Sequence, residues 1–206
     1  MKLPLALLVS GMLLAASSAS AADSGAFMGV GVGQVNIEID DLAGSGYQFD
    51  ENDTGYKLFA GYKFMPWLSV EGAYVDGGNP GISATEGGVS AKLNVEVQSL
   101  VASVIFTLPV GDNFELFIKP GIAYWDAKTT ASYSDSFGSD RASDSDDGTA
   151  FFIGGGAAFK FSENFGMRIE YEYFEVAPEY DDYYNEFVDT YDASAGFLSA
   201  SFVYSF

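Results

Sequence analysis

The sequence predicts an all-β protein, an eight-stranded antiparallel up-and-down transmembrane β-barrel. Eight stretches alternate apolar residues with small or polar ones at period two, which is typical of strands that face two different surroundings. Short turns alternate with long segments between these stretches. Beyond the N-terminal leader, no stretch approaches the roughly 18 continuous apolar residues of a membrane-spanning helix. If the chain crosses a membrane, it therefore does so with strands.

The first 21 residues are predicted to be a secretory signal peptide. Lys2 supplies a positive start, Leu3 to Ala16 form a mostly apolar run, and Ala19-Ser20-Ala21 is a small-residue cleavage motif. Cleavage before Ala22 leaves residues 22–206 as one exported barrel domain.

Composition limits the chemistry of this domain. The 206-residue chain has nine basic and 29 acidic residues, a net charge of −20, and loss of Lys2 with the leader makes this eight basic residues and −21. Such a charge disfavours nucleic acid as a partner. Cysteine and histidine are both absent, which removes disulfides, thiolate metal sites and the commonest catalytic base. We therefore expect no cofactor.

The first four predicted strands show the alternation. In the first, Met28, Val30 and Val32 alternate with glycines, and the apolar parity then shifts to Val35, which predicts a bulge near Gly33. The fourth strand begins indistinctly and becomes regular from Leu100. The four strands cover residues 28–39, 56–64, 68–75 and 93–108.

The last four predicted strands repeat the pattern. The fifth follows a turn at Val110 to Asn113, and in the eighth the parity from Leu198 to Phe206 is apolar while the other carries mostly serine. These four strands cover residues 114–125, 153–161, 167–174 and 197–206.

Connections alternate in length. Turns of a few residues lie near 65–67, 110–113 and 162–164, and long segments run at 40–54, 76–92, 126–148 and 175–193. Short turns at one end and long loops at the other are typical of bacterial outer-membrane barrels, with the turns in the periplasm and the loops outside the cell. Both termini are then periplasmic.

Charges identify the inner face. Eight charged residues fall on the parity opposite the aromatic and branched side chains: Lys57, Lys63, Glu71, Lys119, Lys160, Arg168, Glu170 and Glu172. A Lys or Arg facing lipid at mid-bilayer costs roughly 2–4 kcal/mol, so these side chains are expected to point into the barrel, where they must pair. Gly and Ala on the same face are expected to make room for them. A soluble lipocalin-like barrel with the apolar face inside is the disfavoured alternative.

The strands resemble a known family. Gly55 to Phe64, Glu71 to Tyr74, Leu108 to Val110, Lys119 to Trp125 and Arg168 to Tyr171 are similar to the strands of OmpA-type outer-membrane β-barrels. The resemblance covers nearly all of the mature chain, without the peptidoglycan-binding domain that follows the barrel in some members.

The resemblance implies two groups of functional residues. Glu71, Lys119, Arg168 and Glu170 take the places of the family's buried charge network, whereas the family's second ion pair falls at Ile105 and Ala158 and is missing. The full predicted interior network is Lys57, Glu71, Lys119, Lys160, Arg168, Glu170 and Glu172. The aromatic C-terminus, with Phe202, Tyr204 and Phe206, is expected to be read by the barrel assembly machinery.

The long segments, together with Glu38 just before the first of them, hold 21 of the 29 acidic residues, which raises the question of divalent cations. Asp144, Asp146 and Asp147 come nearest to a site but lack the spacing of an EF-hand loop, so a solvated acidic surface is favoured and no metal site is predicted. Aromatic residues between 180 and 191 either bind a partner or pack on one another, and packing is slightly favoured.

The preferred function is a structural or surface-interaction role in the outer membrane through long acidic loops. The expected surroundings are outer-membrane lipid and lipopolysaccharide, with an unknown extracellular ligand and a monomeric state. A small channel is the alternative. A lipid-modifying enzyme is disfavoured because there is no histidine, Ser199 and Ser201 have no visible activating base, and Glu170 and Glu172 are better explained as ion-pair partners.

Overall fold

The computed structural model describes residues 24–39, 49–86, 89–134, 138–176 and 193–206, and the predicted signal peptide lies outside these ranges. No helix in these ranges is long and apolar enough to span a membrane. The strands are β1 (Gly25–Ile39), β2 (Phe49–Met65), β3 (Leu68–Asp76), β4 (Gly81–Glu86), β5 (Val89–Val110), β6 (Phe114–Ser134), β7 (Ser139–Lys160), β8 (Phe165–Val176) and β9 (Ala193–Ser205).

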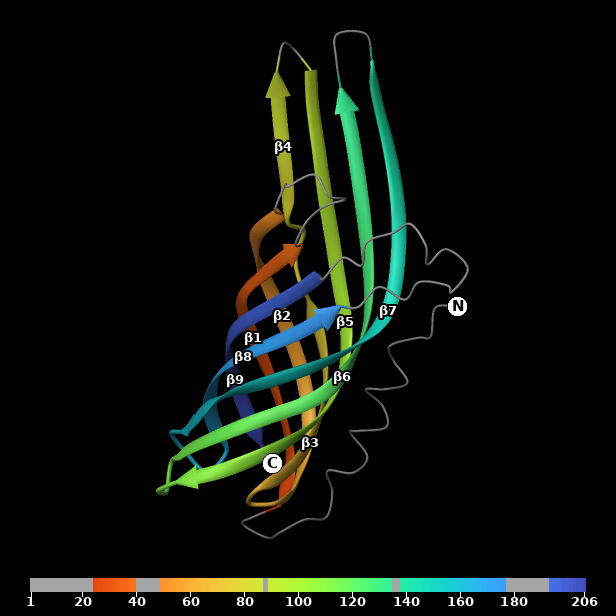
Figure 1. The fold of residues 1–206 in the computed structure, drawn as a ribbon. Helices are drawn as coiled ribbons and strands as arrows, with labels where there is room; N and C mark the ends of the chain where they lie inside the picture. The colour runs from red at the N-terminus through yellow and green to blue at the C-terminus, as the bar shows by residue number, and fades with distance from the viewer. Residues whose placement is uncertain (1–23, 40–48, 87–88, 135–137, 177–192) are drawn as a thin grey trace, which may run out of the picture.

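The strands form one closed antiparallel ring (Figure 1). The order is β3-β2-β1-β9-β8-β7-β6-β5-β4, and β3 also pairs with β5. Because β3 pairs with Gln98 to Phe106 of β5 and β4 pairs with Val89 to Asn94, β3 and β4 occupy one position in the ring. The predicted eight-stranded antiparallel barrel is confirmed, with its third strand interrupted.

A short break separates β3 from β4 without releasing β5. Gly78 adopts a φ of 77°, in the left-handed region that favours glycine. The backbone amide of Asn79 donates to Asp53 Oδ2 at 2.6 Å, which ties the break to β2. On the other side, the Val95 amide donates to the Pro80 carbonyl at 2.9 Å. The break is therefore a hydrogen-bonded turn within the barrel wall.

The predicted bulge near Gly33 is wrong. The register of β1 on β2 runs without interruption from Gly25 opposite Lys63 to Ile39 opposite Phe49. Val35 stays on the luminal parity and is buried in the core cluster beside Phe197. The apolar parity shifts along β1 because the lumen is itself apolar at that height, not because the strand slips.

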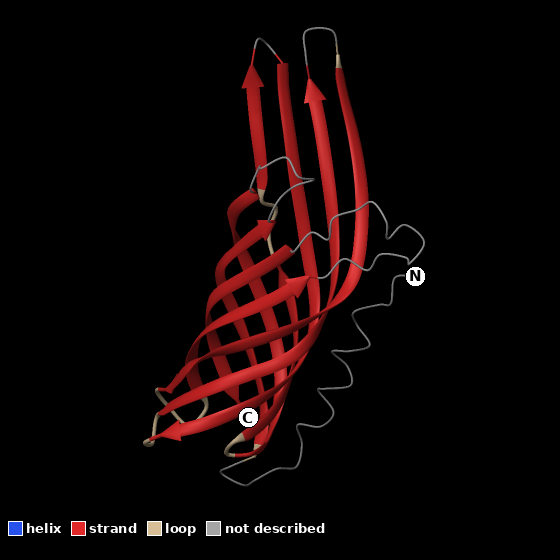
Figure 2. Ribbon diagram, in the orientation of Figure 1, coloured by secondary structure: helices blue, strands red, loops and turns tan. Residues whose placement is uncertain are grey.

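Two segments expected to be loops continue as strands. The segment 126–148 belongs mostly to β6 and β7, and 76–92 mostly to β4 and the start of β5. These strands rise together beyond the closed barrel, as Figure 2 shows. We call the part formed by residues 81–86, 89–98, 126–134 and 138–149 the protruding sheet. Where both faces of a strand meet water, the apolar alternation that identifies strands is lost.

Glycines in the lumen lie directly opposite phenylalanines. Gly29 faces Phe59 and Gly61 faces Phe27 across β1 and β2, and a Cβ at either glycine would meet the ring of its partner. The pairs Gly121–Phe152 and Gly156–Phe117 repeat this arrangement across β6 and β7. The sequence analysis expected small residues to make room for charges, but at these positions they make room for aromatic rings.

Replacing Gly156 with alanine should destabilise the barrel, because its Cβ would meet the Ile169 carbonyl oxygen and the Phe117 ring. We expect a loss of about 1–3 kcal/mol in the free energy of unfolding, as for other overpacked cores. Urea titration of protein folded in lipid vesicles would measure it. The matched control is Gly155→Ala, which faces outward and meets only the Phe117 carbonyl oxygen, at 3.3 Å. Equal losses in both variants would show that luminal crowding is not the cause.

Candidate functional site

The lumen contains a cluster of six charged side chains, three cationic and three anionic. Lys57 comes from β2, Glu71 from β3 and Lys119 from β6, and β8 supplies the other three. All six residues are buried, with Lys119 and Glu172 at 0% exposure. They lie inside because each has the luminal parity of its strand. The predicted interior residues that the structure joins in one cluster are Lys57, Glu71, Lys119, Arg168, Glu170 and Glu172.

Glu71 joins two cations across the lumen. Arg168 Nη1 donates to Glu71 Oε2 at 2.6 Å, and Lys119 Nζ donates to Glu71 Oε1 at 3.2 Å. Each carboxylate oxygen thus has its own cationic donor. Such charge-assisted hydrogen bonds are roughly twice as strong as neutral ones.

Glu170 and Glu172 complete the cluster by sharing two lysines. Lys57 Nζ donates to one carboxylate oxygen of each, both at 2.7 Å. Lys119 Nζ lies 2.8 Å from Glu170 Oε2 and also pairs with Glu172. The six charges therefore sum to zero and link strands on opposite sides of the lumen.

Aromatic rings surround the cations. The guanidinium of Arg168 lies 4.9 Å from the centroid of the Phe59 ring and 5.0 Å from that of Phe117. Lys119 Nζ lies 5.9 Å from the centroid of Phe152. The rings exclude water and add cation–π attraction, which is stronger for a desolvated cation. At this height of the described lumen the charged side chains and the rings are buried against one another.

Lys160 lies apart from the other predicted network residues. Its Nζ is 2.8 Å from Glu115 Oε1, and Lys63 Nζ is 3.0 Å from the same oxygen. This second cluster lies at the end of the lumen that carries the short turns, and the Lys160 side chain is 44% exposed. Glu115 was missed as a network residue, although its place next to Phe114 on the luminal parity of β6 was the signal for it.

Several other predicted positions are now located. Ile105 is buried in the luminal core and Ala158 packs beside that core, so apolar packing replaces the family's second ion pair. Ser199 and Ser201 are buried on β9, and their hydroxyls contact no hydrogen-bond partner among the described residues. The serines are next to the charge cluster, since Ser201 pairs with Arg168 and Ser199 with Glu170 in the register.

The C-terminal aromatics form a chain of rings at the end of the barrel that carries the short turns. Phe202 lies 5.6 Å from Phe165, Tyr204 lies 5.1 Å from Phe165, and Tyr204 is 5.0 Å from Phe206, measured between ring centroids. The Phe206 amide donates to the Ala26 carbonyl at 3.0 Å, which joins the end of the chain to β1. The last residue is thus part of the seam between the first and last strands.

The candidate cation ligands of β7 do not converge. Asp144 and Asp146 face one side of the strand and Asp147 the other, and no group of three potential ligands occurs in the described ranges. Asp144 and Asp146 each accept a hydrogen bond from the next backbone amide. The aromatic segment 180–191 lies outside the described residues.

Neutralising Glu71 should destabilise the barrel strongly. Glu71→Gln leaves Arg168 and Lys119 short of a buried counter-charge, so we expect a loss of about 3–5 kcal/mol in the free energy of unfolding. The control is Glu115→Gln in the partly exposed second cluster, where we expect about 1 kcal/mol or less. Urea titrations of both variants in vesicles would separate them. An equal loss of unfolding free energy in Glu115→Gln would show that the buried cluster contributes no more to stability than the exposed one.

Deletion of Phe206 should reduce insertion into the outer membrane in cells while the purified variant still folds in vesicles. The reason is that the predicted assembly signal would lose its last residue, whereas the fold loses one peripheral ring contact and the terminal hydrogen bond to Ala26. The amount of heat-modifiable protein in outer-membrane fractions measures insertion, and Phe161→Ala, on the same outward aromatic surface, is the control. Normal heat-modifiable protein from the deletion would show that Phe206 is only one more ring of that surface.

Comparisons with known proteins agree with this architecture. The chain is similar to Ail, the attachment invasion locus protein of Yersinia pestis, with 20% identity, a TM-score of 0.51 and coverage of 87% of this chain and 98% of Ail. Neisserial surface protein A matches with 14% identity, a TM-score of 0.56 and coverage of 88% and 99%. OprG from Pseudomonas aeruginosa matches with 14% identity, a TM-score of 0.51 and coverage of 89% and 97%.

A search of curated proteins gave no match. The family described as outer membrane protein beta-barrel domain matches residues 6–206, nearly the whole chain. The chain belongs to the outer membrane protein beta-barrel domain family and is an outer-membrane β-barrel.

Proposed function

We propose that this protein is a closed outer-membrane anchor that presents the protruding sheet to partners outside the cell. The observation that carries the proposal is the contrast between a lumen filled by side chains and strands that continue well past the barrel (Figure 1). A filled lumen favours an anchoring role over conduction, and the long strands supply a rigid surface.

The packing of the lumen supports the closed state. Six phenylalanines belong to the buried core together with the charge cluster, and they come from β1, β2, β6, β7, β8 and β9. Opening a water path would require separating ion pairs that are already desolvated, which is costly when either partner is left unpaired. A channel remains the alternative function, and no specific observation favours it.

The inner face of the protruding sheet suggests the chemistry of a partner. Asp140, Asp144 and Asp146 of β7 share the luminal parity with Val95 and Val97 of β5. Among the described residues, 139–150 of β7 pair only with β6, because pairing with β8 begins at Phe151. The described part of the chain thus leaves this edge of β7 without a second strand, beside carboxylates and apolar side chains. Such an edge suits an extended peptide that carries both cationic and apolar residues.

The proposed topology follows the family. The leader directs export, the barrel assembly machinery inserts the chain as a monomer among lipid and lipopolysaccharide, and the short turns face the periplasm. Ail has been solved in complex with the heparin analogue sucrose octasulfate. For the inner face of this sheet, a cationic ligand fits better than a polyanion, because all three charges named above are negative. The absence of histidine supports a non-enzymatic role.

Shortening the protruding sheet should abolish partner binding but not folding. Residues 127–146 can be replaced by Asn-Gly, because Asp126 and Asp147 are directly paired. We expect wild-type protein in detergent to bind a synthetic peptide of alternating lysine and valine at least about tenfold more tightly than the shortened variant, with weaker binding at high salt. A peptide of alternating glutamate and valine is the control. Equal binding by both proteins would refute the proposed role of the sheet.

Two further measurements complete this test. An epitope inserted at 136 should be labelled on intact cells, whereas one inserted at 112, in the short β5–β6 turn, should not. The reverse pattern would overturn the proposed orientation. Planar-bilayer recordings of the wild type should show no reproducible conductance, and steady conductance would favour the channel instead.

A further inference from the structure

The cations outside the lumen all lie on one face of the protruding sheet. Of the eight basic residues that follow the predicted signal peptide, five point into the barrel: Lys57, Lys63, Lys119, Lys160 and Arg168. The remaining three are Lys92 on β5, Lys128 on β6 and Arg141 on β7.

The register places these three cations on the outward face. Lys92 and Arg141 both pair with Ser132 of β6, one from each side, so they lie in one row across the sheet. Lys128 lies four residues below Ser132 on the same strand and therefore on the same face. This parity continues that of Ile122 and Tyr124, which face outward from the barrel. The face that carries the cations is therefore the one that looks over the surrounding membrane.

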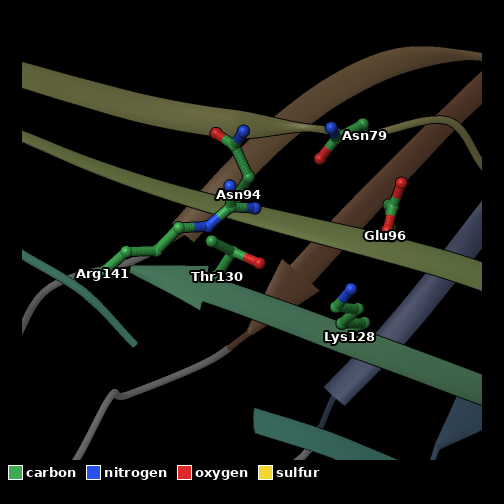
Figure 3. A pocket seen from close by; sticks show the side chains of 6 residues that line it. All are labelled: Asn79, Asn94, Glu96, Lys128, Thr130 and Arg141. Atoms are coloured by element: carbon green, nitrogen blue, oxygen red, sulfur yellow. The ribbon is translucent and has the colours of Figure 1, made fainter. Parts of the chain in front are cut away.

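Two of these cations line a polar pocket on that face (Figure 3). Its other lining residues are Asn94 and Glu96 of β5, Thr130 of β6, and Asn79 from the break between β3 and β4. In Figure 3 the Arg141 side chain extends across β6 toward Asn94, while Lys128 and Glu96 lie at the other end of the pocket. We call this group the outer pocket.

The three cations of the outward face differ from those of the lumen because they form no ion pair within the described ranges. Each luminal cation contacts a carboxylate, whereas Lys92, Lys128 and Arg141 form no ion pair with any carboxylate in the described ranges. Glu96 lies directly opposite Lys128 in the register of β5 and β6, but the two side chains form no ion pair. The lining of the pocket therefore carries two cations and one carboxylate, while Asp126 and Asp147 lie one row closer to the barrel on the same face. The amides of Asn79 and Asn94 and the hydroxyl of Thr130 add neutral donors.

The height of the pocket suits the polar layer of a membrane. Tyr124 is the last outward aromatic residue of β6 before the polar residues begin, and Lys128 follows four residues later. Four residues of a strand extend about 13 Å, which reaches past the hydrocarbon into the headgroup region. A ligand held in the neighbouring leaflet is already concentrated beside the pocket, which favours it over a soluble ligand.

We propose that the outer pocket binds a phosphate group of the phosphorylated glycolipid in the surrounding outer leaflet. The Arg141 guanidinium donates two hydrogen bonds to two phosphate oxygens, and Lys128 adds a second cation. Asn94 and Thr130 lie between them and donate to the remaining oxygens. Glu96 limits the excess positive charge, so the pocket suits one phosphate rather than a polyanion. The proposal depends on the proposed placement of the sheet outside the cell.

Purified components test this binding. The folded protein in a neutral maltoside detergent with a chelator would be titrated with purified rough-type lipopolysaccharide, and in parallel with the same lipid after enzymatic dephosphorylation. The test variant is Lys128→Gln with Arg141→Gln. The control is Ala91→Glu with Ala142→Glu, which changes the net charge by the same amount on the opposite, exposed face. The heat-modifiable gel shift confirms that each variant is folded.

We expect the test variant to bind phosphorylated lipid at least about tenfold more weakly, and the control to bind as the wild type does. Wild-type binding should also weaken with added salt and after dephosphorylation. Unchanged affinity in the test variant, or equal affinity for the dephosphorylated lipid, would overturn the proposal. In a last titration, sucrose octasulfate is added in place of the lipid. An affinity for it equal to that for lipopolysaccharide would assign the pocket to a soluble anion instead. The alternating lysine–valine peptide is not involved, so the two proposals fail independently.

Discussion

The structure depends on one constraint, which is that a charge cannot face lipid. An eight-stranded barrel has an interior just wide enough for side chains, so each charge excluded from the lipid face must find a partner within a narrow, water-poor space. Three cations and three carboxylates meet this condition in the main cluster, with no net charge left over. Glu115, shared by Lys63 and Lys160, meets it near the short turns.

The glycine–phenylalanine pairs and the charge cluster support each other. A glycine on one strand leaves space for the ring of its direct neighbour, and these rings then lie against Arg168 and the two lysines. Removing water by means of the rings strengthens each ion pair, and it also raises the cost of leaving any of these charges unpaired. The lumen is therefore specified by two matched sets of side chains, not by charge alone.

The alternation of residues was sufficient to predict the ring, its closure and the face on which Lys57, Glu71 and Arg168 lie. It could not assign partners, because cations and carboxylates that share a parity can be combined in several ways, and height along the barrel decides which of them meet. It also misread Val35, since an apolar side chain suits the luminal core as well as the lipid. The unassigned ion-pair partners and the misread Val35 have the same cause: the alternation distinguishes two faces of a strand but carries no information on depth along the barrel.

The protruding sheet escaped prediction for a related reason, and its charges follow a different rule. Beyond the membrane neither face is apolar, so β6 and β7 lose their alternation although their pairing continues to Ser134 and Ser139. Water solvates both faces there, and ion pairing is no longer obligatory. Lys92, Lys128 and Arg141 share the outward face with Glu96, Asp126 and Asp147, yet none of the three cations forms an ion pair in the described ranges. Cations that the fold leaves unpaired are better explained by what the outward face meets, which under the proposed topology is the surrounding leaflet.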